Sequence, residues 1–113
     1  MELTKRKVGW YMNLFYEAME KGIDTTEIRD WDKAIAFFSE AIRLDPTNAR
    51  GYCSRGMAYG ENEEWDKAIA DFSESIRLDP LDAVTYMNRG VTYGEKQEWN
   101  KEDKDFAMAN KLG

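Results

Sequence analysis

The sequence contains no histidine, a single cysteine and only two prolines among its 113 residues. Without histidine, Ser-His-Asp and Cys-His catalytic arrangements cannot form, and most zinc sites lose a preferred ligand. Cys53 has no second cysteine with which to form an internal disulfide, which fits a reducing compartment. These absences predict a protein that is not an enzyme, that uses no cofactor or metal, and that resides in the cytoplasm.

Basic charge and long apolar runs are also scarce. The chain has 16 Lys and Arg against 22 Asp and Glu, a net charge of -6. Nucleic-acid binding requires a basic surface that replaces phosphate counterions, so we expect no nucleic-acid partner. The apolar run after the basic residues 5–7 is too short to cross a membrane, which takes roughly 20 residues, and a signal-peptide cleavage site is missing after it. We therefore expect no membrane partner, with an interfacial anchor formed by residues 5–7 and Trp10 as a weaker alternative.

What the chain does contain is a period of 34 residues. Residues 31–64 and 65–98 are identical at 22 of 34 aligned positions. Trp31, Trp65 and Trp99 recur at this spacing. Such self-similarity is typical of repeat arrays, in which each unit buries its apolar face against its neighbours.

Each unit is predicted to form two helices. Over residues 66–78 the apolar side chains follow a helical stripe, and Asp79 precedes a proline that disfavours further helix. Asp82 is suited to cap a second helix. Gly56 and Gly90 fall in the middle of these second helices, where glycine costs about 1 kcal/mol relative to alanine. We expect a close approach between helices to compensate.

With these features the chain resembles the tetratricopeptide repeat (TPR) family, whose unit is 34 residues long. The matching residues of one unit are Tyr52, Gly56, Tyr59, Ala68, Phe72 and Pro80. The pattern departs from the family at Arg55, which replaces a leucine, and at Ser75, which replaces an alanine. The resemblance implies an all-α fold, a right-handed α-solenoid of stacked antiparallel helix pairs with about six helices.

The resemblance further implies one domain over residues 1–113. An insertion in the first unit places Tyr11, Leu14 and Ala18 on the inward face, which a register without a gap does not. The predicted parts are a first repeat over about 8–48 with the insertion at 23–29, a second repeat over 49–82, and a third over 83–113 that ends in a polar capping helix.

The last helix is expected to be that cap, because it carries polar residues where earlier copies are apolar. Ile35 and Ile42 lie on the face that meets the next unit in this family, and the last copy has Asp103 and Asn110 at those positions. Burying an unpaired carboxylate there would cost several kcal/mol. We expect this face to meet water, and contact with a partner is the alternative.

By resemblance, the first helix of each predicted repeat, as in 49–82 and 83–113, lines a concave groove that binds a peptide or a helix of another protein. Several of the groove positions are methionines, which adapt to apolar and amphipathic partners. The function expected is a non-catalytic protein–protein interaction module. The candidate groove residues are Met12, Tyr16, Met19, Arg50, Cys53, Met57, Val84, Met87, Asn88 and Val91.

The family's best-known groove is a clamp of Lys, Asn and Arg that holds the carboxylate tail of chaperones. The matching positions in this chain are Met12, Tyr16, Ser54, Val84 and Asn88. None of these side chains carries a positive charge. An acidic chaperone tail is therefore not the expected ligand.

An alternative hypothesis is a self-assembling structural unit, in which the groove is filled by a second copy or by the chain's own N-terminus. The N-terminal segment supports it, because Trp10, Tyr11, Leu14 and Phe15 would place apolar residues on more than one face of a helix. This hypothesis predicts a homo-oligomer. The periodic tryptophans are expected to be structural, and Arg55 and Arg89 to pair with nearby carboxylates.

Overall fold

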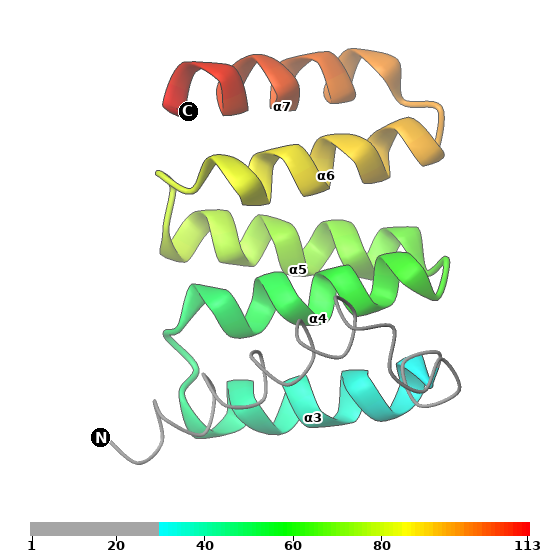
Figure 1. Cartoon of the computed structure of the whole chain (residues 1–113), viewed down its shortest axis with the longest axis vertical. Helices are drawn as coiled ribbons and strands as arrows, with labels where there is room; N and C mark the ends of the chain where they lie inside the picture. The colour runs from blue at the N-terminus through cyan, green and yellow to red at the C-terminus, as the bar shows by residue number, and fades with distance from the viewer. Residues whose placement is uncertain (1–29) are drawn as a thin grey trace, which may run out of the picture.

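A computed structural model describes residues 30–113, which form a stack of α-helices without a strand. Consecutive helices run in opposite directions (Figure 1). The described helices are α3 (Trp31–Leu44), α4 (Ala49–Glu61), α5 (Trp65–Leu78), α6 (Ala83–Glu95) and α7 (Trp99–Leu112). The all-α, solenoid-like architecture predicted from the repeats is confirmed. The predicted count of about six helices is higher than the five described, because it included a helix within residues 1–29, which lie outside the described part.

The helix boundaries follow local chemistry. Asn48 and Asp82 each accept a hydrogen bond of 3.0 Å from the backbone two residues later, which caps α4 and α6. Asp30 caps α3 in the same manner through the backbone N–H of Lys33, at 3.0 Å. The helix predicted over 66–78 begins one residue earlier and ends as expected before Asp79. None of the described helices has the length and apolar character needed to cross a membrane.

Two glycines allow the helices of a unit to approach closely. A Cβ atom on Gly56 would lie 2.8 Å from ring atoms of Phe72, and a Cβ on Gly90 would lie 2.8 Å from the ring of Phe106. Real Cβ atoms do not come so close to a ring, so only glycine fits without movement. The expectation that close contact compensates for glycine in mid-helix is confirmed.

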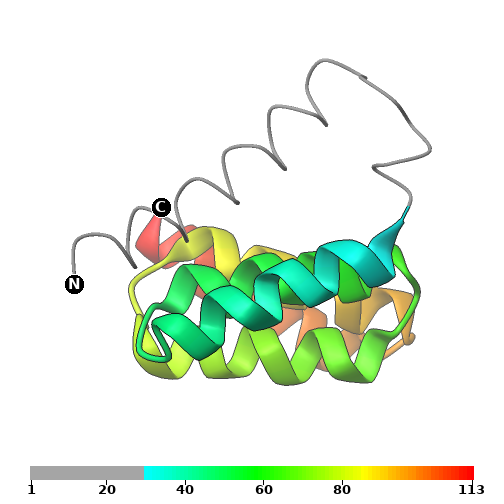
Figure 2. The ribbon, with the colours of Figure 1, turned by 90° about the horizontal axis from the view of Figure 1, so that it is seen from below.

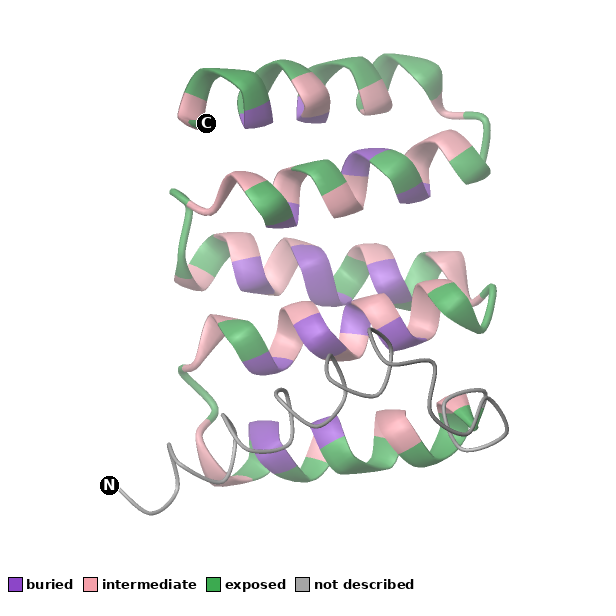
Figure 3. Ribbon diagram, viewed as in Figure 1, coloured by how far each residue is buried: buried purple, intermediate pink, exposed green. Residues whose placement is uncertain are grey.

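The core lies between the helices rather than around one centre. Phe38, Ala41 and Ala58 form a buried cluster, against which Trp31 and Ile35 pack. Figure 3 shows buried residues on the helix faces that look toward neighbouring helices. Seen from below the stack, the described helices lie along one common direction, with α5 at one edge (Figure 2).

The apolar face of α3 points to α4, as the sequence predicts. Ile42 is buried, and its Cγ1 lies 3.1 Å from the position of a Cβ on Gly51 of α4. On α7 the equivalent face is polar, and both Asp103 and Asn110 are exposed. The predicted exposure of this face is therefore present, while the repeat boundaries and the capping role stay predictions.

Two arginines link three helices each. Arg55 donates two hydrogen bonds to Asp71, at 2.7 and 2.8 Å, and one to Ser39 at 3.2 Å. Arg89 repeats the arrangement with Asp105, at 2.8 Å for both bonds, and with the Ser73 hydroxyl at 3.1 Å. We call these two sets the arginine ladder.

The ladder is an internal feature of the stack. Asp71 and Asp105 are 6% and 4% exposed, and hydrogen bonding to them raises the pKa of Arg55 and Arg89 above the ordinary arginine value. The prediction that these arginines pair with nearby carboxylates is confirmed. A role for them in direct recognition of a partner's acidic group is thereby disfavoured.

Candidate functional site

Three apolar side chains on α6 are exposed in one stripe. Val84, Met87 and Val91 are 60%, 51% and 50% exposed. Spaced three and four residues apart, they share one face of the helix. We call these three residues the α6 stripe. All three belong to the groove positions predicted from the sequence.

The predicted groove residues of α4 are less accessible. Arg50 is exposed, whereas Cys53 and Met57 are partly buried, as is Asn88 on α6. The predicted groove residues of the first unit are outside the described residues; they are Met12, Tyr16 and Met19.

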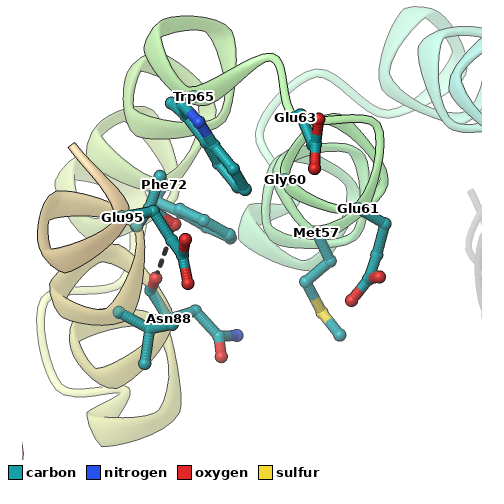
Figure 4. A pocket seen from close by; sticks show the side chains of 10 residues that line it. Met57, Gly60, Glu61, Glu63, Trp65, Phe72, Asn88 and Glu95 are labelled. Atoms are coloured by element: carbon teal, nitrogen blue, oxygen red, sulfur yellow. Dashed lines mark hydrogen bonds between the residues drawn. The ribbon is translucent and has the colours of Figure 1, made fainter.

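A cavity of about 410 Å³ separates the C-terminal ends of α4 and α6. Figure 4 shows side chains from α4 on one side, side chains from α6 on the other, and the Trp65 ring above. The residues that line it are Met57, Gly60, Glu61, Glu63, Trp65, Phe72, Asn88, Val91, Thr92 and Glu95. The structure thus brings Met57, Asn88 and Val91 together in one cavity, while Val84 and Met87 are not among its lining residues.

The rim of this cavity is acidic, which sequence reasoning missed. Glu61 is the last residue of α4, Glu95 is the last residue of α6, and Glu63 lies in the turn after α4. All three are exposed. Their recurrence was a usable signal, since Glu61 and Glu95 are one repeat period apart. Only the stacking of α4 beside α6, however, brings them to one opening.

The side chain of Asn88 lies at the wall of this cavity. Its buried nitrogen Nδ2 makes no hydrogen bond of normal geometry within the described part of the chain, and the Asn88 amide interacts with the Cys53 thiol. The backbone carbonyl of Asn88 is used, because it accepts a 2.8 Å hydrogen bond from Thr92 Oγ1 (Figure 4).

The three described clamp positions, Ser54, Val84 and Asn88, carry no positive charge. Ser54 is 2% exposed and thus is not available to a ligand in the groove. Val84 is exposed but apolar. Neither they nor Asn88 offers a positive charge to a carboxylate, so the described residues contain no such clamp.

The structure also describes the surroundings of Cys53 and of the periodic tryptophans. Burial raises the pKa of the Cys53 thiol, and Thr85 Oγ1 lies 3.6 Å from its sulfur. A buried thiol of raised pKa is a poor nucleophile. Trp31, Trp65 and Trp99 each begin a helix, and the helices that begin at Trp65 and Trp99 follow an inter-helix turn. Across residues 30–113, no three side chains of the usual ligand types gather to hold a metal ion.

Comparison with known proteins places these features in a family. Residues 49–81 match a family profile described as "Tetratricopeptide repeat". Residues 29–63 match a second profile, described as "TPR repeat". Together the two matches cover the helix pairs α3–α4 and α4–α5.

One curated protein and two solved structures are similar to the chain. Outer envelope protein 64, mitochondrial, of Arabidopsis thaliana is 42% identical over 40 residues, which is 35% of this chain and only 7% of that protein. The structure of the Arabidopsis OM64 TPR domain is 29% identical, covers 90% of this chain and 84% of its own, and has a TM-score of 0.72.

The second TPR of Spaghetti (RPAP3), solved bound to the HSP90 peptide SRMEEVD, superposes over 100% of both chains with a TM-score of 0.79. At 21% identity it shows a shared fold only. The 34-residue period, the glycine-to-phenylalanine contacts and the two profile matches agree. The resemblance seen in the sequence is therefore confirmed, and residues 29–81 are tetratricopeptide repeats.

Proposed function

We propose that this protein is a non-catalytic protein–protein interaction module that binds an amphipathic helix or an apolar peptide against α4 and α6. The observation that carries the proposal is the α6 stripe beside the cavity. Fully burying a side chain such as Met or Val is worth about 1.5–3 kcal/mol, so covering the stripe with a partner is favourable. An exposed apolar strip with a polar rim is typical of a docking surface.

The family relationship supports peptide binding as the general activity. One structural neighbour was solved with a bound peptide, SRMEEVD. That peptide is acidic and ends in a carboxylate, and the present groove has apolar or neutral residues at the clamp positions Ser54, Val84 and Asn88. The proposed ligand therefore differs in chemistry from that of the neighbour.

The test uses two fluorescein-labelled model peptides of 18 residues. Both have leucine on one helical face, and the polar face is lysine in one (Leu/Lys) and glutamate in the other (Leu/Glu). A scrambled form of each peptide has the same composition without an apolar face. Fluorescence anisotropy should show binding of at least one amphipathic peptide and none of its scrambled form.

The groove is tested with Met87→Gln, which keeps the length and charge of the side chain. Loss of one buried apolar side chain should weaken peptide binding by about fivefold or more. Met108→Gln is the matched control, because Met108 is also exposed, at 38%, but lies on α7 and belongs neither to the α6 stripe nor to the cavity lining. Equal affinities of the two variants would refute the groove on α6.

A further inference from the structure

The cavity between α4 and α6 concentrates negative charge. Its rim carries the carboxylates of Glu61, Glu63 and Glu95, and neither lysine nor arginine lines it. Among residues 30–113 these three carboxylates make no ion pair. Acidic side chains elsewhere in the described part are often paired, as Asp71 is with Arg55. The rim is thus a concentration of uncompensated charge rather than an ion-pair network.

The ends of α4 and α6 add to this negative potential. The C-terminus of a helix carries partial negative charge, and basic residues are favourable there. α3, α5 and α7 have a basic residue in the last turn, whereas α4 and α6 have none there and end in glutamate. Lys96 follows α6 as its C-cap, but it pairs with Asp66 and Glu98. Glu61 and Glu95 therefore stand where a carboxylate is electrostatically disfavoured for folding.

The third carboxylate is held at a conformational cost. Glu63 has a φ of 60°, in the left-handed region that favours glycine. Gln97 has the equivalent conformation, with a φ of 61°, in the turn after α6. Gln97 is uncharged and does not line the cavity. The two turns therefore share a backbone shape, and they differ in whether that position presents a charge to the cavity.

Inside the rim the cavity offers apolar walls. Met57, Phe72 and Val91 are among the residues that line it. A side chain with an aliphatic stem and a cationic head matches a cavity with apolar walls and an acidic rim. Lysine and arginine are such side chains, because they lay their stems on apolar surface and keep the charge at its edge.

From these observations we infer that the cavity binds a lysine or arginine side chain of the docked peptide. Its stem lies on Met57 and Val91, and its charge lies among the three rim carboxylates. This inference rests on the proposed function and names its ligand class: an amphipathic segment with a basic polar face. Such a site selects basic side chains, whereas the carboxylate clamp of the family binds an acidic tail.

The experiment compares the Leu/Lys and Leu/Glu peptides on the full chain. We expect the Leu/Lys peptide to bind at least about tenfold more tightly at low salt. We expect that preference to shrink as salt rises past about 0.1 M, where the Debye length is about 10 Å. The double variant Glu61→Gln with Glu95→Gln should lose about fivefold or more for Leu/Lys and less than about twofold for Leu/Glu.

A matched control separates the cavity from the net charge of -6. The double variant Asp32→Asn with Asp103→Asn removes the same number of charges from exposed positions on α3 and α7. It should bind Leu/Lys within about twofold of the unchanged protein. Equal losses in the two double variants would overturn the inference, because the net charge alone would then explain the preference.

The remaining outcomes are also decisive. Equal binding of Leu/Lys and Leu/Glu would overturn the basic-side-chain site and leave the proposed function standing, whereas binding of neither peptide would overturn the proposed function itself. Light scattering on the same samples tests a second copy as occupant: a dimer that dissociates when Glu61 and Glu95 are changed would overturn the external ligand. The triple variant Lys5→Gln, Arg6→Gln and Lys7→Gln tests the chain's own N-terminal segment as a competitor for the cavity. If this variant binds both peptides about tenfold more tightly or better, the N-terminal segment is the occupant and the external ligand is overturned.

Discussion

Replacing Asp105 by asparagine should remove a large part of the stability of this stack. Asp105 is 4% exposed and accepts both of its arginine hydrogen bonds from Arg89 at 2.8 Å. The Asp105→Asn variant keeps the size of the side chain and removes its charge. The guanidinium of Arg89 then stays in a mostly buried place, hydrogen-bonded to Ser73 but without its counter-ion.

The size of the effect follows from the burial of the pair. Breaking a buried ion pair by removing one partner costs about 3–5 kcal/mol. The Arg89 side chain is 20% exposed, so water compensates part of the loss, and we expect about 2–3 kcal/mol. Domains of this size have about 5–15 kcal/mol in total. The midpoint of thermal unfolding should therefore fall by about 10 °C.

The assay is urea unfolding at 25 °C, followed by far-UV circular dichroism and tryptophan fluorescence. Glu74→Gln is the control, because Glu74 also pairs with an arginine, Arg77, but at the surface of α5. This control should leave the unfolding midpoint unchanged. An Asp105→Asn protein as stable as the control would refute the importance of the arginine ladder.

Three further changes have defined outcomes. Gly56→Ala should lower the stability of the protein by about 1–2 kcal/mol, because overlap with the Phe72 ring outweighs the better helix propensity of alanine. A higher midpoint of thermal unfolding would instead show that the ring has room to move. Glu63→Gly and Gln97→Gly should each raise the free energy of unfolding in urea by about 0.5–1 kcal/mol, because glycine adopts the left-handed conformation without strain. Only Glu63→Gly should weaken binding of the Leu/Lys peptide. A lower free energy of unfolding in both variants would show that these two positions are not strained. Cys53 should react with iodoacetamide at pH 8 at least about tenfold more slowly than free cysteine, measured by mass spectrometry, because its raised thiol pKa and its burial reduce the reactive thiolate, and a rate equal to that of free cysteine would contradict this.

Most of the fold was predictable because it is local and repeated. The 34-residue period defined the unit, and Asp82 correctly marked the start of α6. Mid-helix glycine correctly indicated a close contact, although the partner ring of Phe72 lies in the next helix. These signals act within a few residues or recur at a constant spacing, so a single sequence contains them.

The candidate site was predictable only in part. The resemblance to the family placed Met87 and Val91 in the groove, and both side chains are exposed. The acidic rim was missed, because Glu61 and Glu95 become neighbours only when two units stack. The partners of the arginine ladder were unnamed for the same reason: Asp71 lies 16 residues from Arg55, on another helix.

The arginine ladder also bears on how a unit depends on its neighbours. Arg55 belongs to α4, yet it holds Ser39 of the preceding helix pair as well as Asp71 of its own. Cutting the chain between α3 and α4 would remove a hydrogen-bond acceptor from a mostly buried cation on the retained side. We therefore expect that loss of α3 would destabilise α4. The position of α4 beside α6, and with it the shape of the cavity, would then depend on a helix that does not line the cavity.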